Sequence, residues 1–181
     1  MTTGATREHL PADELLGLLP QVLSTTAPRL VSLASIIPED ILRRRPLADE
    51  WSPYEVLHHL LDTERLVFPP RIRAFLADSG TIENVDQNDV QWDMERTARA
   101  IAGEIAGLRA GTLDLVATLT PDDLDREAVH SAYGRLSLGQ MLHYYPAHDL
   151  THLVQIERAL IQPFLPGVGP WEGGIEDMSM R

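Results

Sequence analysis

Residues 51–66 have the sequence WSPYEVLHHLLDTERL and contain the most clearly marked helix start in the chain. Ser52 offers a hydroxyl at the N-cap, Pro53 takes the first helical position, and Glu55 takes the third. In such a capping box, the serine and glutamate side chains satisfy backbone N–H groups that the first turn leaves unpaired. The sequence therefore predicts a helix that starts here and runs to about Asp78.

A second capping box lies near the start of residues 134–160, which have the sequence GRLSLGQMLHYYPAHDLTHLVQIERAL. Ser137 is its N-cap and Gln140 its third helical residue, so we expect a helix that continues toward Ile161. Proline lacks an amide hydrogen and clashes with the preceding turn, so Pro146 predicts a kink in this helix.

Apolar residues at helical spacing predict two further long helices, one over about residues 15–33 and one over about residues 93–119. Pro20 and Pro28 are expected to bend or restart the first of these helices, and the Pro69-Pro70 pair is expected to break the helix that begins at residue 53. Shorter elements are expected as follows: a helical turn at 38–45, a surface loop at 79–92, a short helix from 120, an irregular or briefly extended stretch at 126–136, and a surface tail after 162 that Trp171 pins.

The composition excludes several kinds of chemistry. The chain has no cysteine, and its 15 basic residues are all arginine. Disulfides, thiolate metal sites, a cysteine nucleophile and a lysine Schiff base are therefore excluded. A reactive group has to come from a metal, a histidine, a carboxylate or a co-substrate.

Length and charge limit the class of protein. At 181 residues and 44% hydrophobic content, the chain is long enough for one buried core, so we predict a single domain over residues 1–181. The formal net charge of -12 disfavours nucleic acid and anionic membranes as partners. No stretch approaches the roughly twenty apolar residues that span a bilayer. We expect a cytoplasmic protein that acts on a small-molecule substrate, and a homodimer is left open.

Two of the seven histidines, His148 and His152, are four residues apart and so lie on one face of the predicted helix. A third imidazole from another helix would complete a tripod with open coordination positions, which is typical of a catalytic metal site. Adjacent His58 and His59 point about 100° apart, so at most one of them joins the tripod, and spacing alone does not choose between them. His9 and His130, by contrast, fall outside the apolar helical pattern and are treated as ordinary.

The two quoted segments together resemble the DinB-like (DinB/YfiT-like) superfamily of metal-dependent bacterial proteins. Its first motif, W-S-x-x-E-x-L-x-H-L, matches the segment that ends in His59 and Leu60, and its last motif, H-D-x-x-H-x-x-Q-I, matches the segment from His148 to Ile156. The resemblance covers about residues 12–162, which we take as the core, and it leaves 163–181 as a C-terminal tail.

The resemblance implies an all-α fold, an up-up-down-down four-helix bundle. It implies a divalent nickel or zinc ion held by His59, His148 and His152, so it selects His59 rather than its neighbour. It also implies a low-molecular-weight thiol as co-substrate, since characterised relatives are thiol-dependent transferases and an isomerase. The absence of cysteine is consistent with a thiol that belongs to the co-substrate.

Two residues near the predicted ligands are candidates for a supporting role: Asp62 to orient a histidine ring, and Gln155, three residues after His152, to contact a ligand or substrate. Glu64 is expected in a solvated ion pair, and Asp149 is expected to be a surface charge. Capping fully explains Glu55.

Tyr144 and Tyr145 are within reach of a cavity mouth, although core packing is the default for both.

Three functions follow from these observations. The first is a thiol S-transferase with a three-histidine metal site. The second, of another class, is a bundle with a vestigial metal site that acts as a stress-associated binding or dimerisation module. The third is a metal-dependent hydrolase, in which an open metal position activates water. Metal content separates the second from the others, and thiol dependence separates the first from the third.

Overall fold

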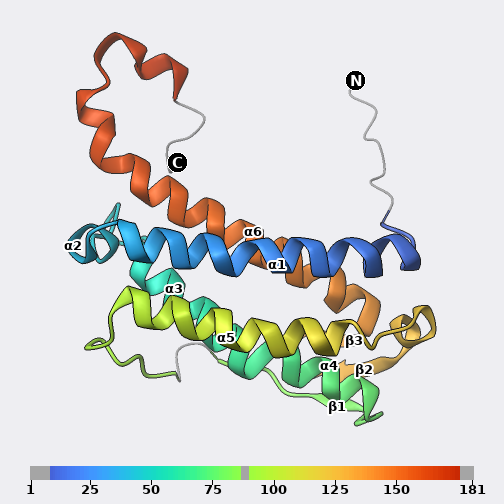
Figure 1. Cartoon of the computed structure of the whole chain (residues 1–181). Helices are drawn as coiled ribbons and strands as arrows, with labels where there is room; N and C mark the ends of the chain where they lie inside the picture. Colours follow the sequence, from blue (N-terminus) through green and yellow to red (C-terminus); the bar gives the residue numbers. More distant parts are fainter. Residues whose placement is uncertain (1–8, 87–89, 176–181) are drawn as a thin grey trace.

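Four long helical segments lie side by side in the computed structural model, which describes residues 9–86 and 90–175 (Figure 1). The segments are α1 (Ala12–Ile36), the pair α3 and α4 (Pro53–Asp62 and Phe68–Leu76), α5 (Ala98–Val116) and α6 (Leu138–Ile161). A π-helical turn, η1 (Thr63–Val67), joins α3 to α4, so these two form one rod. The predicted all-α four-helix bundle is therefore confirmed.

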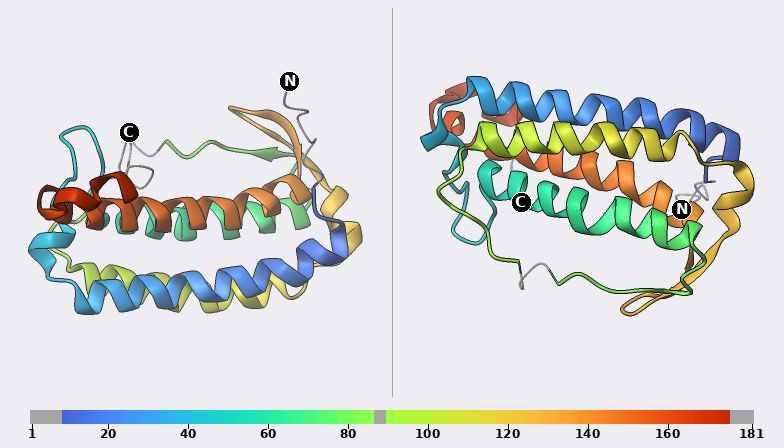
Figure 2. Two further views of the ribbon diagram at one scale, coloured as in Figure 1. Left: turned by 90° about the horizontal axis from the view of Figure 1, so that it is seen from above. Right: turned by 60° about the horizontal axis from the view of Figure 1, so that its bottom comes forward.

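Each rod packs against two others: α1 lies against α5 and α6, and α3 lies against the same two helices. Helices α1 and α6 run in one direction, whereas the α3–α4 rod and α5 run in the other (Figure 2). Along the chain the order is thus up, down, down, up, which differs from the expected up-up-down-down. The reason is that the chain returns along the bundle between α4 and α5, whereas its other connections stay at one end.

A small three-stranded sheet lies at the end of the bundle where α4 ends and α6 begins. Strand β1 (Thr81–Ile82) pairs in parallel with β2 (Glu127–His130), which pairs antiparallel with β3 (Gly134–Ser137). The stretch expected to be irregular or briefly extended is thus a hairpin. Strand β1, in contrast, lies where a surface loop was expected.

The remaining elements are short helices. They are α2 (Glu39–Leu42), η3 (Pro121–Asp125), η4 (Gln162–Gly167) and η5 (Gly169–Gly174). Trp171 in η5 is 77% exposed, so the prediction that it pins the tail is wrong. Within the described residues, no helix is both long and apolar enough to cross a membrane.

The predicted capping boxes are present. The Ser52 hydroxyl accepts a hydrogen bond from the Glu55 amide at 3.2 Å, and the Glu55 carboxylate accepts one from the Ser52 amide at 2.8 Å. Ser137 and Gln140 form the same pair of bonds at the start of α6, and a third box begins η3. Helix α5 starts later than expected because Thr97 is its N-cap.

The prolines act differently from one another. Pro20 and Pro28 lie inside α1, and Pro146 lies inside α6, yet both helices are continuous by their hydrogen bonds. The expected break near Pro69-Pro70 does occur, as the π-helical turn η1 followed by a new helix start. Two successive prolines leave two carbonyls of the preceding turn without amide partners, whereas in the first turn of α4 their missing amide hydrogens cost nothing.

The interior contains two apolar clusters. One lies toward the sheet and includes Leu19, Phe68 and Tyr145, and the other lies toward α2 and includes Leu30, Leu57 and Ile105. Between them, at the level of the π-helical turn, the bundle buries a layer of charged and hydroxyl side chains. The candidate functional site lies beside this layer.

Candidate metal centre

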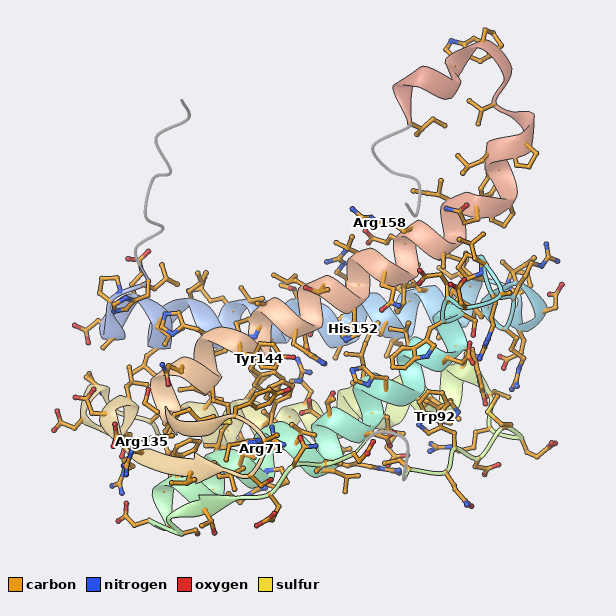
Figure 3. The ribbon with its side chains drawn as sticks, turned by 180° about the vertical axis from the view of Figure 1, so that it is seen from behind. Arg71, Trp92, Arg135, Tyr144, His152 and Arg158 are labelled. Atoms are coloured by element: carbon orange, nitrogen blue, oxygen red, sulfur yellow. The ribbon has the colours of Figure 1, made fainter. Side chains whose placement is uncertain are left out.

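Three histidines from two helices converge at the middle of the bundle. His59 comes from the last turn of α3, and His148 and His152 come from successive turns of α6. The Nε2 atoms of His59 and His148 are 3.0 Å apart, and one nitrogen from each of the three rings lies within 4.8 Å of the others. The structure therefore brings together the residues that the family motif selects, and Figure 3 labels His152 on α6.

The donor set of this histidine cluster fits a divalent cation. Two imidazole nitrogens 3.0 Å apart need a shared proton or a cation between them, and zinc binds histidine nitrogens at roughly 2.0–2.1 Å. His152 Nδ1 lies 2.8 Å from Gln155 Oε1, so it carries the proton and leaves Nε2 as a lone-pair donor. Burial and the neighbouring His148 lower the pKa of His152, which favours its neutral form.

Aromatic rings surround the cluster. The Trp51 ring lies 5.1 Å from the His59 ring and 6.5 Å from the His152 ring, and Phe68 lies 5.2 Å from the ring of His148. The side chain of His59 is buried and that of His148 is 9% exposed, whereas His152 is half-buried. A ligand would therefore approach from the side of His152.

The neighbouring His58 points elsewhere and does not join the cluster. Its ring stacks on Trp92 at 5.3 Å, and burial lowers its pKa. Trp92 donates a hydrogen bond through its indole nitrogen to Asp62 at 2.7 Å. The prediction that Asp62 orients a histidine ring is therefore wrong, because its carboxylate binds this indole instead.

Two charged side chains near the histidines were predicted to be solvated, and both predictions are wrong. Glu64 and Asp149 are each 3% exposed. Arg109, itself 4% exposed, lies 2.8 Å from a carboxylate oxygen of each. Both side chains point inward because each residue lies at helical spacing from buried residues of the same rod. An outward position would require the rod to rotate and expose those buried neighbours.

Hydroxyl groups complete this Arg109 network. Thr112 and Tyr145 each donate to a Glu64 carboxylate oxygen at 2.5 Å, and Thr26 donates to Asp149 at 2.9 Å. The network thus ties α1, η1, α5 and α6 together.

The charges of the network determine two further pKa shifts. Burial alone would lower the pKa of Arg109, but Tyr145, Asp149 and Glu64 together raise it. Burial raises the pKa of Tyr145 well above its usual value.

A sequence signal for the network did exist. Arg109 and Thr112 fall on the stripe that also buries Ile101, Ile105 and Val116. A charged residue on a buried stripe needs a partner, so Arg109 indicates buried carboxylates on facing helices.

The network meets the histidine cluster at Asp149. Its second carboxylate oxygen, Oδ1, lies 4.0 Å from Nδ1 of His148, and neither atom has a hydrogen-bond partner among the described residues. Burial raises the pKa of Asp149, but contacts with His148, Arg109 and Thr26 outweigh it and lower the pKa overall. A carboxylate behind a histidine favours the neutral or metal-bound imidazole with its proton on Nδ1.

The two adjacent tyrosines have different positions. Tyr145 is fully buried and its ring stacks on Phe68 at 3.9 Å, in agreement with core packing. Tyr144 is 59% exposed, and its ring lies 5.6 Å from the ring of His148. Tyr144 is therefore the tyrosine at the edge of the candidate site.

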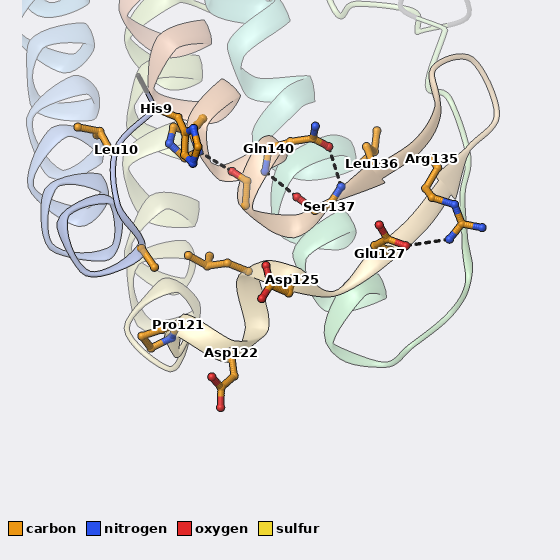
Figure 4. Close-up of a pocket in the computed structure, with 14 residues that line it drawn as sticks. His9, Leu10, Pro121, Asp122, Asp125, Glu127, Arg135, Leu136, Ser137 and Gln140 are labelled. Carbon is orange, nitrogen blue, oxygen red and sulfur yellow. Dashed lines mark hydrogen bonds and ion pairs between the residues drawn. The ribbon is translucent and has the colours of Figure 1, made fainter. Parts of the chain in front are cut away.

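A large cavity lies elsewhere. It has a volume of about 990 Å³ and opens at the end of the bundle near η3 and the hairpin, where Asp122, Asp125 and Glu127 line it (Figure 4). None of the three clustered histidines lines it. Size alone therefore does not identify the site.

Comparisons with known proteins identify a family and a similar fold. The sequence profile described as the DinB superfamily matches residues 23–156, which include all three clustered histidines. None of the curated proteins matches the sequence significantly. Among solved structures, a protein described as "YfiT from Bacillus subtilis is a probable metal-dependent hydrolase with an unusual four-helix bundle topology" is similar at 19% identity. Its TM-score is 0.76, and the match covers 88% of this chain and 93% of that one.

Proposed function

This chain belongs to the DinB superfamily, and from that membership and its three converging histidines we propose that it is a metal-dependent enzyme. The convergence of His59, His148 and His152 is the observation that carries the proposal. Three imidazoles on two rigid helices leave coordination positions open, as catalytic metal sites do. Nickel or zinc is the metal we propose, because imidazole ligands suit both.

The surrounding residues have distinct roles in this proposal. His59, His148 and His152 hold the ion, and Gln155 fixes the ring of His152 in the tautomer that can bind it. Trp51 shields one side of the histidines from water. The ion supplies a positive charge that lowers the pKa of a bound thiol or water.

Thiol transfer is the first reaction that we propose. The chain has no cysteine, so a thiol nucleophile has to come from a low-molecular-weight co-substrate. In this reaction a sulfur–carbon bond forms, the bond from that carbon to the leaving group breaks with its electron pair, and the thiol proton passes to solvent. The half-buried side of the cluster at His152 gives both reactants access.

Hydrolysis is the second candidate, and the description of the Bacillus subtilis protein as a probable metal-dependent hydrolase favours it. It would use the same histidines, with water in place of the thiol. The two reactions differ in one measurable requirement, which is the thiol.

Metal analysis of untagged protein tests the proposal first. We expect one divalent ion per chain, loss of the ion in His152→Ala, and retention in His143→Ala, which removes a histidine of the same helix outside the cluster. A metal-free wild-type protein after dialysis against nickel or zinc would contradict the proposal and favour a non-enzymatic binding module.

Activity measurements then separate the reactions. Bacillithiol, mycothiol and glutathione are each supplied with monobromobimane, and hydrolysis of 4-nitrophenyl acetate is followed without thiol. Thioether formation that His152→Ala lacks supports the transferase. Ester hydrolysis without thiol, lost in the same variant, supports the hydrolase instead.

A further inference from the structure

A second, smaller cavity lies beside the histidine cluster, between α4, the hairpin and the start of α6. Its volume is about 350 Å³. Its lining residues are Arg71, Ile82, His130, Tyr133, Leu136, Gln140, Met141 and Tyr144. We call this cavity the Arg71 pocket.

The polar groups of the Arg71 pocket are mainly donors. His130 is 2% exposed, and its Nδ1 accepts a hydrogen bond from the Ala132 amide at 3.1 Å. The neutral ring therefore carries its proton on Nε2, which is buried and has no hydrogen-bond partner among residues 9–86 and 90–175. The Nε–H of Arg71 is likewise buried and has no partner in the part of the chain that the structure describes. Two donors are thus left to pair with a ligand.

Among the described residues, no carboxylate lines the pocket. Arg71 forms no ion pair with any described residue, and its guanidinium donates a 3.2 Å hydrogen bond to the backbone carbonyl of Glu83. Arg109 makes the contrast clear, because two carboxylates flank that guanidinium. In a chain of net charge -12, a half-buried arginine without an acidic partner indicates an anionic ligand.

The rest of the lining is apolar or aromatic. Ile82 and Met141 are buried in the wall, and the rings of Tyr133 and Tyr144 lie at its edge. Such a wall suits a hydrocarbon or aromatic body better than a bare inorganic ion. We propose that the Arg71 pocket binds a small organic acid, with the carboxylate on Arg71 and His130 and the apolar body against Met141 and Tyr144.

The position of the pocket connects it to the histidine cluster. Tyr144 lines the pocket, and its ring lies 5.6 Å from the ring of His148. Tyr144 and Gln140 precede His148 by four and eight residues, or about 6 and 12 Å along α6. Figure 3 shows Arg71 and Tyr144 on neighbouring segments, with His152 farther along α6. If the proposed function holds, the acid is its substrate or co-substrate, with its far end toward the histidines.

Binding of benzoate tests the pocket directly. Isothermal titration of the full-length protein should give binding to benzoate at least tenfold tighter than to benzamide, which has the same shape but no charge. The Arg71→Gln variant should lose at least tenfold in benzoate affinity. The matched control Arg73→Gln removes an exposed arginine of the same helix and should leave the affinity unchanged. Arg71→Lys keeps the charge and should retain part of the binding.

Two further titrations make the outcome decisive. Inorganic phosphate should bind more weakly than benzoate, and a reversed order would overturn the assignment to an organic acid. Equal binding of benzoate and benzamide, or an equal loss of benzoate affinity in Arg71→Gln and Arg73→Gln, would overturn the pocket itself. The titrations are repeated after metal removal and in His152→Ala, where benzoate should still bind. Failure of the metal site thus leaves this result intact, and failure of the pocket leaves the metal analysis intact.

Discussion

Two polar clusters lie side by side at the middle of the bundle, and they differ in how their hydrogen bonds are used. In the Arg109 network, guanidinium, carboxylate and hydroxyl groups pair almost completely across the four rods. In the histidine cluster, by contrast, ring nitrogens from three residues point at one another. Apart from one carboxylate oxygen of Asp149, the Arg109 network has little left to bind among the described residues, whereas the histidine cluster has the donor set that we propose for a cation.

The difference distinguishes a structural polar group from a functional one. Buried charges are retained without a ligand when their partners are present, and Arg109 meets that condition. Converging imidazole nitrogens meet that condition only with a shared proton or a cation between them. The same criterion separates Arg71 from Arg109, although both are arginines among apolar neighbours.

The largest expected effect comes from breaking the Arg109 network. Arg109→Met leaves two buried carboxylates without their cation, and we expect a loss of about 3–5 kcal/mol in the free energy of unfolding. Urea denaturation followed by circular dichroism measures it. The matched control is Arg29→Met, because Arg29 pairs with Glu157 on the exposed surface and should cost less than about 1 kcal/mol. Similar losses in the two variants would show that the network is not a stability element.

The next prediction separates adjacent histidines. His59→Ala should abolish metal binding, because it removes one of three ligands, whereas His58→Ala should keep one ion per chain. Equilibrium dialysis against nickel and zinc, with elemental analysis, measures the stoichiometry. Loss in His58→Ala with retention in His59→Ala would reverse the assignment and with it the contrast between the two clusters.

A smaller effect is expected at Gln155. Its side chain holds the ring of His152 through a 2.8 Å contact, and residues that orient a ligand typically contribute 10–100-fold to metal affinity. We expect a loss in that range for Gln155→Ala, measured by competition with a chromophoric chelator. Val154→Ala removes an exposed neighbour and should change nothing. An unchanged affinity in Gln155→Ala would mean that the helix alone orients His152.

Local rules predicted most of the fold. The capping boxes at Ser52 and Ser137 act within one turn, so they placed the two helices that carry the histidines. The choice of His59 over His58 came from the family motif. Local spacing cannot make this choice, because the two adjacent residues differ only in the residues that each contacts in the folded structure. Glu64 and Asp149 were misplaced for that same reason, since their burial depends on Arg109 from a helix distant in the sequence. The order of helix directions likewise depends on a long-range feature, which is that the chain returns along the bundle between α4 and α5.

The smallest expected effect is the pH dependence contributed by His130. Burial and the nearby Arg71 lower its pKa, so the folded protein keeps this ring neutral where the unfolded chain, with a pKa near 6.5, takes up a proton. A lowered pKa of a histidine means that stability is lost as the pH falls below about 6.5, by at most about 1.4 kcal/mol per pH unit for one proton. Urea midpoints of metal-free protein between about pH 7.5 and 5.5 should therefore fall less steeply in His130→Gln than in the parent. Equal slopes would show that His130 has the same pKa in the folded and the unfolded chain, so its ring in the Arg71 pocket would take up a proton below about pH 6.5.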